Sequence, residues 1–167
     1  MEYAGQRVGI FIDIQNLYYS ARHLYKTHVN FSKILELGLG KGQLVRAIGY
    51  GIRTDLPKEE KFFKALKDAQ FEVKLKDLQV FAGGMHKGNW DVGMAVDIIR
   101  LAPKLDVVVL ASGDGDFVDL VEYLQNQGIY VVVFAFGQSA SAKLVERANV
   151  FVDMDKDSAS FLLKKSQ

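Results

Sequence analysis

The stretch that decides the fold is "VVVLASGDGDF", residues 107–117, where five apolar residues run into a glycine-rich loop with two carboxylates. An uninterrupted apolar run of this length, ended by a turn, is typical of a strand that is buried on both faces. Asp114 and Asp116 follow that strand one glycine apart. A similar stretch, "VGIFIDIQN" at residues 8–16, places Asp13 directly after an apolar run. Both stretches predict buried strands that end in acidic groups.

Strands and helices alternate along the rest of the chain. The apolar and β-branched runs predict strands over 7–12, 43–52, 71–81, 105–111, 129–136 and 150–152. The helical patterns predict helices over 16–26, 90–101, 117–127, 141–148 and 158–164, and two more that begin at Ser32 and Pro57. This alternation predicts an α/β fold, a three-layer α/β/α arrangement around a central, mainly parallel sheet. No repeat or linker divides the chain, so we expect residues 1–167 to form a single domain.

The connections carry their own signals. "AGGMHKG", residues 82–88, is expected to be a glycine-rich loop, and Asn89 after it is expected to cap the next helix. Gly128 is expected to end the helix over 117–127.

The composition of the chain restricts the classes of protein to which it can belong. The 167 residues carry a formal net charge of +1, which neither indicates nor excludes a nucleic-acid partner. The absence of cysteine excludes disulfides and thiolate metal sites and fits a reducing compartment. The first residues lack the pattern of a signal peptide and no apolar run is long enough to span a bilayer, so we expect a cytoplasmic protein without a membrane partner.

Four acids are predicted to meet at one edge of the sheet. Asp13, Asp114 and Asp116 follow strands, and Asp91 lies in the first turn of a helix that follows a strand. Sites in such sheets form at the carboxyl ends of the strands, where the strand order reverses. The acids meet only if the strand over 7–12 lies beside the strand over 105–111. Like charges need neutralisation, and oxygen-only ligands suit Mg²⁺ or Mn²⁺, which activate water and stabilise phosphoryl charge.

Each acid also has a simpler interpretation. Asp13 and Asp116 could cap the helices that follow them, and Asp91 could favour its helix dipole. These roles explain each acid singly but not a shared edge, so the metal site is the favoured hypothesis. Asp97 follows Asp91 by six positions, which places it about a third of a turn around the helix, so both side chains cannot point squarely at one metal ion. It is expected to pair with Arg100 or Arg46, or to remain solvated.

Three segments carry a family resemblance: "FIDIQN" (11–16), "KGNWDVGMAVDI" (87–98) and "ASGDGDFVDLVEYLQNQGIYVVVFAFG" (111–137). Together they resemble the LabA-like branch of the NYN domain, in the PIN-like nuclease superfamily, from about Val8 to about Asp153. The resemblance implies a PIN-like fold with the first strand beside the strand that ends in the acidic loop. It also implies metal-dependent cleavage of RNA with Mg²⁺ or Mn²⁺. Its catalytic and metal-binding residues would be Asp13, Asp91, Asp114 and Asp116.

Further residues are candidates for contacts around the acids. By position in the family, Asn16 and Ser112 would orient ligands or phosphate, although a local turn hydrogen bond explains them equally well. Lys87 would contact the substrate backbone. Arg53 follows a strand and is expected near the same edge; for it, as for His86 and Arg22, an ordinary solvated charge is the alternative.

Aromatic residues and two departures from the family complete the set. Trp90, Tyr18 and Tyr19 are candidates for stacking on unpaired bases, with burial as the alternative for Trp90 and at least one tyrosine. Gly115 stands where the family often has serine. Asp119 stands where proline is common, and would either tune the metal or face solvent.

The leading function is therefore a metal-dependent ribonuclease that hydrolyses the phosphodiester bonds of RNA, with single-stranded RNA as its expected partner and a homodimer as a weaker expectation. The alternative is a non-catalytic RNA- or protein-binding regulatory module of the same fold. The acids favour the enzyme, because a pure RNA binder has no reason to gather negative charge where phosphates bind. A phosphatase is a third interpretation, but "DIQN" after the first strand lacks the Asp-x-Asp-x-Thr pattern of the common aspartyl-phosphate type.

Overall fold

The computed structural model describes residues 2–53, 57–77, 79–80 and 86–163. Its centre is a six-stranded sheet in the order β3-β2-β1-β6-β7-β8, and every neighbouring pair is parallel. In chain order the strands are β1 (Arg7–Asp13), β2 (Gln43–Arg53), β3 (Glu72–Asp77), β6 (Val107–Ala111), β7 (Tyr130–Ala135) and β8 (Val150–Asp153). A separate antiparallel pair joins β4 (Gln79–Val80) to β5 (His86–Lys87).

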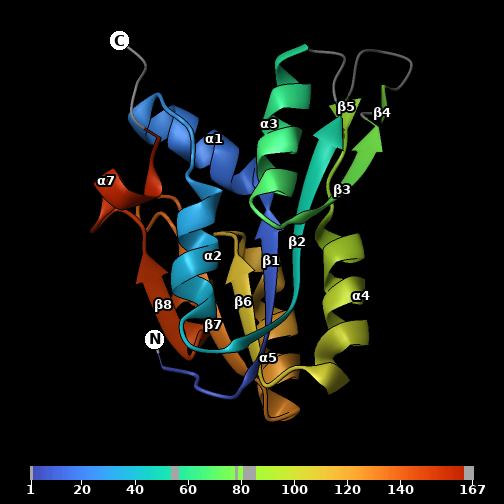
Figure 1. The fold of residues 1–167 in the computed structure, drawn as a ribbon, viewed down its shortest axis with the longest axis vertical. Helices are drawn as coiled ribbons and strands as arrows, with labels where there is room; N and C mark the ends of the chain where they lie inside the picture. The colour runs from blue at the N-terminus through green and yellow to red at the C-terminus, as the bar shows by residue number, and fades with distance from the viewer. Residues whose placement is uncertain (1, 54–56, 78, 81–85, 164–167) are drawn as a thin grey trace.

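Helices cover both faces of this sheet (Figure 1). They are α1 (Ile14–Tyr25), α2 (Phe31–Leu39), α3 (Pro57–Asp68), α4 (Asp91–Leu101), α5 (Val118–Asn126), α6 (Ala142–Arg147) and α7 (Ser158–Phe161). Two 3₁₀ turns complete the set, η1 (Ala102–Lys104) and η2 (Gly115–Phe117). The predicted α/β fold class, with three layers and a parallel sheet, is confirmed.

Alternating side chains of the strands supply two cores. Ile10 and Ile12 of β1 pack in the core on the side of α1, α2 and α3, whereas Phe11 packs in the core on the side of α4 and α5. All five residues of β6 are fully buried, because the strand lies inside the sheet with helices over both faces. This two-sided burial explains why its sequence is continuously apolar.

The strand order reverses between β1 and β6. The chain proceeds from β1 to β2 and β3 on one side, and from β6 to β7 and β8 on the other. The register pairs Ile12 with Ala111, so the two strands end level with each other. The adjacency on which the predicted site depends is thus present, and it lies at the switch point of the sheet.

Several local predictions differ from the structure. Part of the expected glycine-rich loop forms β5, and the single strand predicted over 71–81 is divided between β3 and β4. Residues 78, 81–85 and 164 of the predicted elements lie outside the described residues. Helix α4 begins after Trp90 rather than after a capping Asn89, because Trp90 occupies the N-cap position without a side-chain cap. Helix α5 begins at Val118, after η2. Gly128 has φ +79°, as expected of a residue that ends a helix.

Within the described part of the chain, no helix combines the length and apolar character that crossing a membrane requires.

Candidate metal centre

Three carboxylates come together where β6 ends and α4 begins. Asp91, Asp114 and Asp116 each offer an oxygen, and these oxygens all lie within 4.8 Å of one another. Asp91 is the first residue of α4, whereas Asp114 and Asp116 belong to the loop and turn after β6. Asp91 and Asp114 are half-buried and Asp116 is exposed. Side chains from two separate segments thus form one acidic group.

Asp13 lies at the same edge, linked to this group through Ser112. Asp13 is the last residue of β1 and is only 9% exposed. Its Oδ1 accepts a hydrogen bond from the Asn16 backbone N–H at 3.1 Å, and its Oδ2 accepts one from the Ser112 hydroxyl at 3.1 Å. The Ser112 oxygen also accepts from the Asp114 backbone N–H at 3.2 Å. Asp13 therefore stands one hydrogen-bonded residue away from the three acids rather than among them.

Burial and like charge both act on the acids. Burial is the main reason that the pKa of Asp13 rises to about 6; the hydrogen bonds to Asn16 and Ser112 oppose it, while Asp91 and Asp114 add to it. Burial likewise raises the pKa of Asp91, and the charges of Asp114 and Asp116 raise it further. Such a set is costly as bare carboxylates, and its all-oxygen chemistry fits Mg²⁺ or Mn²⁺.

The loop between the acids is held from two sides. The Gly113 backbone N–H donates to Asn16 Oδ1 at 2.9 Å, and the Gly113 carbonyl accepts from the Ser141 N–H at 2.9 Å. A Cβ at Gly113 would lie 3.0 Å from the Ala140 Cα, so glycine permits this close approach. At Gly115, where the resemblance leads one to expect serine, an added Cβ would lie 2.8 Å from the Ser141 hydroxyl oxygen.

The simpler roles of the acids are also visible. Asp13 caps α1, as its alternative interpretation predicted. The cap of η2 is Asp114, whose Oδ1 accepts from the Asp116 N–H at 2.9 Å, so the prediction that Asp116 caps the following helix is wrong. Capping and membership of the acidic group are therefore compatible. Asp119 is exposed in the first turn of α5 and is not among the three grouped acids.

Asp97 points to a different set of partners. Its Oδ2 accepts hydrogen bonds from Lys74 Nζ at 2.6 Å and from the Tyr50 hydroxyl at 3.0 Å. The expected separation from the acidic group is present, but the ion-pair partner is Lys74 of β3 rather than Arg100 or Arg46.

The basic residues that were predicted to contact phosphate lie on three different elements. Arg53 ends β2 with a 59% exposed side chain, 3.8 Å from Asp77. Lys87 and His86 form β5, and their side chains lie outside the described structure. Arg22 is exposed on α1. Sequence reasoning missed Lys76 of β3, whose charge lowers the pKa of Asp91 against the effects that raise it.

The aromatic candidates are partly engaged within the protein. Trp90 donates from Nε1 to the Gly51 carbonyl at 2.7 Å and packs edge-on against Tyr50. Tyr18 is half-buried and packs against His28, whereas Tyr19 is 64% exposed. Burial, the alternative for Trp90, fits its contacts better than base stacking does.

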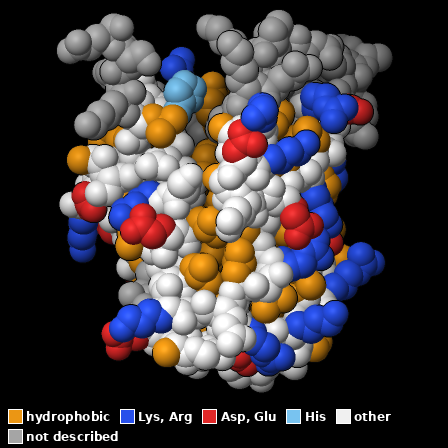
Figure 2. All heavy atoms as spheres, in the orientation of Figure 1, with side chains coloured by type: hydrophobic (Ala, Val, Ile, Leu, Met, Phe, Trp, Pro, Cys, Tyr) orange, Lys and Arg blue, Asp and Glu red, His pale blue; other side chains and the backbone are white. Residues whose placement is uncertain are grey.

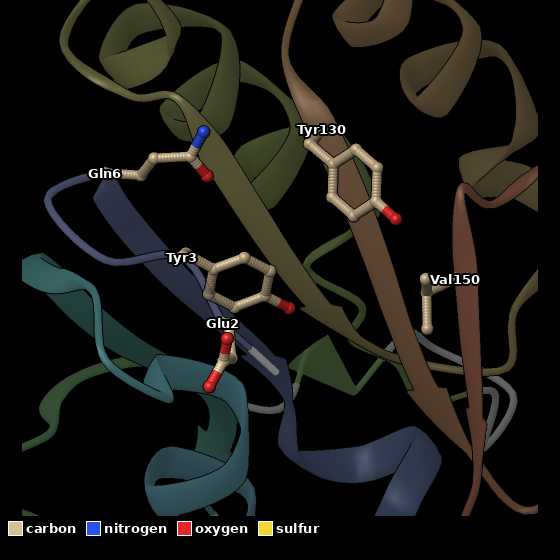
Figure 3. A pocket seen from close by; sticks show the side chains of 5 residues that line it. All are labelled: Glu2, Tyr3, Gln6, Tyr130 and Val150. Atoms are coloured by element: carbon tan, nitrogen blue, oxygen red, sulfur yellow. The ribbon is translucent and has the colours of Figure 1, made fainter.

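A pocket lies at the end of the sheet opposite the acids. Its volume is about 410 Å³, and Figure 3 shows the rings of Tyr3 and Tyr130 beside it. The remaining lining residues are Glu2, Gln6 and Val150. Tyr130 and Val150 begin their strands, which places this pocket at the amino ends. Its one carboxylate, Glu2, is bonded to Lys41 at 2.8 Å, so the pocket does not offer the donor set found among the acids.

Comparison with known proteins places this architecture in a family. A family model described as the NYN domain matches residues 7–155. The chain is 26% identical to the Low amplitude and bright protein LabA of Synechococcus elongatus, with 98% of this chain and 91% of that protein covered. It is 34% identical to a protein of unknown function from Vibrio parahaemolyticus, whose crystal structure matches with a TM-score of 0.87 over 98% of this chain and 99% of that one.

NYN domains are PIN-like and generally nuclease-like; their members generally bind RNA and use divalent metals. The acidic group at the switch point and the match over residues 7–155 agree with this description. This chain belongs to the NYN domain family, in its LabA-like branch.

Proposed function

We propose that this protein is a metal-dependent ribonuclease that hydrolyses phosphodiester bonds of single-stranded RNA. The observation that carries the proposal is the approach of Asp91, Asp114 and Asp116 to within 4.8 Å, next to the buried Asp13. These four acids are the proposed catalytic and metal-binding residues. Their oxygens would hold Mg²⁺ or Mn²⁺, which supplies activation of water and neutralisation of phosphate charge when bound.

The chain's own side chains have distinct parts in this proposal. Asp91 and Asp114 offer half-buried oxygens on one side of the site, and the exposed Asp116 closes the group toward solvent. Asp13 is fixed in orientation by its two hydrogen bonds, from Asn16 and Ser112. Asn16 and Ser112 act as positioning residues, because both also bind the loop that carries Asp114.

The remaining elements of the proposal concern the whole chain. Residues 1–167 are proposed to act as one NYN domain that carries this reaction site. The lack of cysteine supports a cytoplasmic location. A homodimer is the proposed assembly state, and size-exclusion chromatography with light scattering tests it. Arg53 and Lys87 are proposed to contact the RNA backbone, since both lie on strands near the acidic edge.

Incubation of the purified protein with end-labelled single-stranded RNA tests the proposal. Cleavage is expected with Mn²⁺ or Mg²⁺ and not with a chelator. It should disappear in Asp13→Asn and Asp114→Asn while circular dichroism stays unchanged. The matched control is Asp119→Asn, which removes an exposed acid outside the group and should cleave like the wild type.

Two results would redirect the assignment. RNA binding without products at any metal concentration would favour a regulatory binding module of the same fold. Cleavage that persists in both Asp→Asn variants would remove the acids from the reaction.

A further inference from the structure

Lys76 stands near Asp91 of the acidic group, and its charge acts on that carboxyl although the two form no ion pair in the described part of the chain. It lies near the end of β3, where its side chain is exposed. Its Nζ lies 4.2 Å from the ring centroid of Trp90 and donates to the Asn89 carbonyl at 3.3 Å. Asn89 and Trp90 directly precede Asp91, so the ammonium group is positioned at the start of the segment that supplies the acid.

Two cations on the neighbouring strands already have carboxylate partners. Lys74 forms an ion pair with Asp97, and Arg46 forms one with Glu72. Among the residues that the structure describes, Lys76 takes part in no ion pair, since its recorded contacts are an aromatic ring and a carbonyl. Figure 2 shows Lys and Arg side chains gathered along the side of the molecule where β3 and α4 lie. Lys76 lies on β3, and its ammonium group is neutralised by no ion pair among the described residues, so it can still contact an external anion.

The Trp90 ring that contacts this ammonium group is held in place by other parts of the protein. The indole is anchored by the 2.7 Å hydrogen bond to the Gly51 carbonyl and by edge-on packing against Tyr50. Gly93 lies in the first turn of α4, and a Cβ there would be 2.7 Å from Trp90 Cε3 and 3.6 Å from Lys76 Nζ. Glycine is unfavourable inside a helix. Here it leaves the space that the indole occupies, whereas an added Cβ would only be in ordinary contact with the Lys76 ammonium group.

We propose that Lys76, held against the indole of Trp90, binds a backbone phosphate of the RNA strand next to the acidic group. This inference rests on the proposed function, because it takes RNA as the ligand of this edge. The phosphates of an RNA strand that approaches three carboxylates are repelled by their negative charge. A lysine ammonium binds phosphate as a point charge and contributes affinity without reading sequence. Trp90 is a positioning residue rather than a base-stacking platform, since one face of its ring is covered by Lys76.

Fluorescence anisotropy with a labelled single-stranded RNA, in chelator so that cleavage does not contribute, tests the lysine. Lys76→Gln should weaken RNA binding roughly fivefold to tenfold and reduce the slope of log affinity against log salt by about 1. Lys76→Arg keeps the cation and should bind within about twofold of the wild type, because a backbone contact depends mainly on charge. The matched control is Lys104→Gln, which removes an exposed cation in η1, at the other end of α4.

A double-mutant cycle tests the positioning role of Trp90. In the wild-type background, Trp90→Leu should weaken RNA binding. In the Lys76→Gln background, the same substitution should have little effect on RNA binding. Equal losses in the two backgrounds would overturn the positioning role. Lys76→Gln that keeps wild-type affinity and salt slope would overturn the phosphate contact.

These results are separable from the test of the ribonuclease. If the wild type binds RNA but yields no products with Mn²⁺, the nuclease proposal fails. The RNA affinity of Lys76→Gln then still tests the proposed phosphate contact of Lys76. If cleavage is normal and Lys76→Gln cleaves and binds like the wild type, only the lysine inference fails. A wild-type protein that binds no RNA at all ends both.

Discussion

Replacement of Asp114 by asparagine is expected to change the stability of the protein in opposite directions with and without metal. The substitution removes one of the three like charges in the acidic group, so Asp91 and Asp116 lose a repelling neighbour. It preserves the cap of η2, because an asparagine Oδ1 can still accept from the Asp116 N–H. The stability change in chelator therefore reports mainly the relief of repulsion.

The magnitude follows from the separation of the oxygens. At 4.8 Å, two unit charges repel by about 0.9 kcal/mol in a water-like dielectric. Two such pairs involve Asp114, and a Debye length of about 8 Å at physiological salt reduces their combined effect to about 1 kcal/mol. Without metal, Asp114→Asn should therefore unfold with a free energy about 1 kcal/mol higher than that of the wild type.

Metal should reverse this order. A ligand at a hundred times its Kd stabilises the folded state by about 2.7 kcal/mol. The wild type gains this amount from Mn²⁺ and the variant gains little, so the wild type should become the more stable protein by about 2 kcal/mol. The assay is urea unfolding, followed by circular dichroism and by the fluorescence of the single tryptophan, in chelator and in Mn²⁺.

The reasoning is refuted if Asp114→Asn is less stable than the wild type in chelator, or if Mn²⁺ stabilises both proteins equally. Asp119→Asn serves as the control, since Asp119 is exposed and outside the group of three acids. It should follow the wild type within about 0.5 kcal/mol in both conditions.

Three further expectations concern the stability of the fold, the first at the site and the other two near the amino ends of the strands. Ser112→Ala removes a buried hydroxyl that donates to Asp13 and should lower the free energy of unfolding by about 1–3 kcal/mol in urea; an unchanged midpoint would contradict the bond. The Arg7 guanidinium and backbone N–H hold the pKa of Asp106 at about 2, below its ordinary 3.8, so this pair stabilises the fold above pH 3.8 and loses its effect toward pH 2. The advantage of the wild type over Asp106→Asn in urea should therefore shrink over that interval, and a constant difference would argue against the pairing. Gly128→Ala forces a side chain into a φ of +79° and should cost about 1 kcal/mol in the same assay; an unchanged free energy of unfolding would contradict the strain at this turn.

The sequence predicted the strands at the site well because both are buried. The runs around Ile12 and Ala111 are apolar, and burial in a sheet requires that pattern locally. No local sequence pattern indicates that these two strands are neighbours, because the residues that pair between them lie 99 positions apart in the chain. It was an implication of the family resemblance, and the register of β1 and β6 confirms it.

The errors come from tertiary contacts. Asn89 looked like a helix cap, but Trp90 holds the N-cap position of α4, and its indole is anchored to the Gly51 carbonyl of β2. Asp97 was expected to pair with an arginine, whereas the edge strand β3 brings Lys74 to it. Lys76 was overlooked for the same reason, because its approach to Trp90 depends on packing between β3 and α4.

The pairing of β1 with β6 has a consequence for biosynthesis. A nascent chain that has left the ribosome only as far as α4 carries Asp13 and Asp91 but neither Asp114 nor Asp116. The inner edge of β1 also stays without its neighbour until Val107–Ala111 has been translated. Under the proposed function, an unfinished polypeptide is therefore harmless to the message that encodes it, and competence is acquired late in translation.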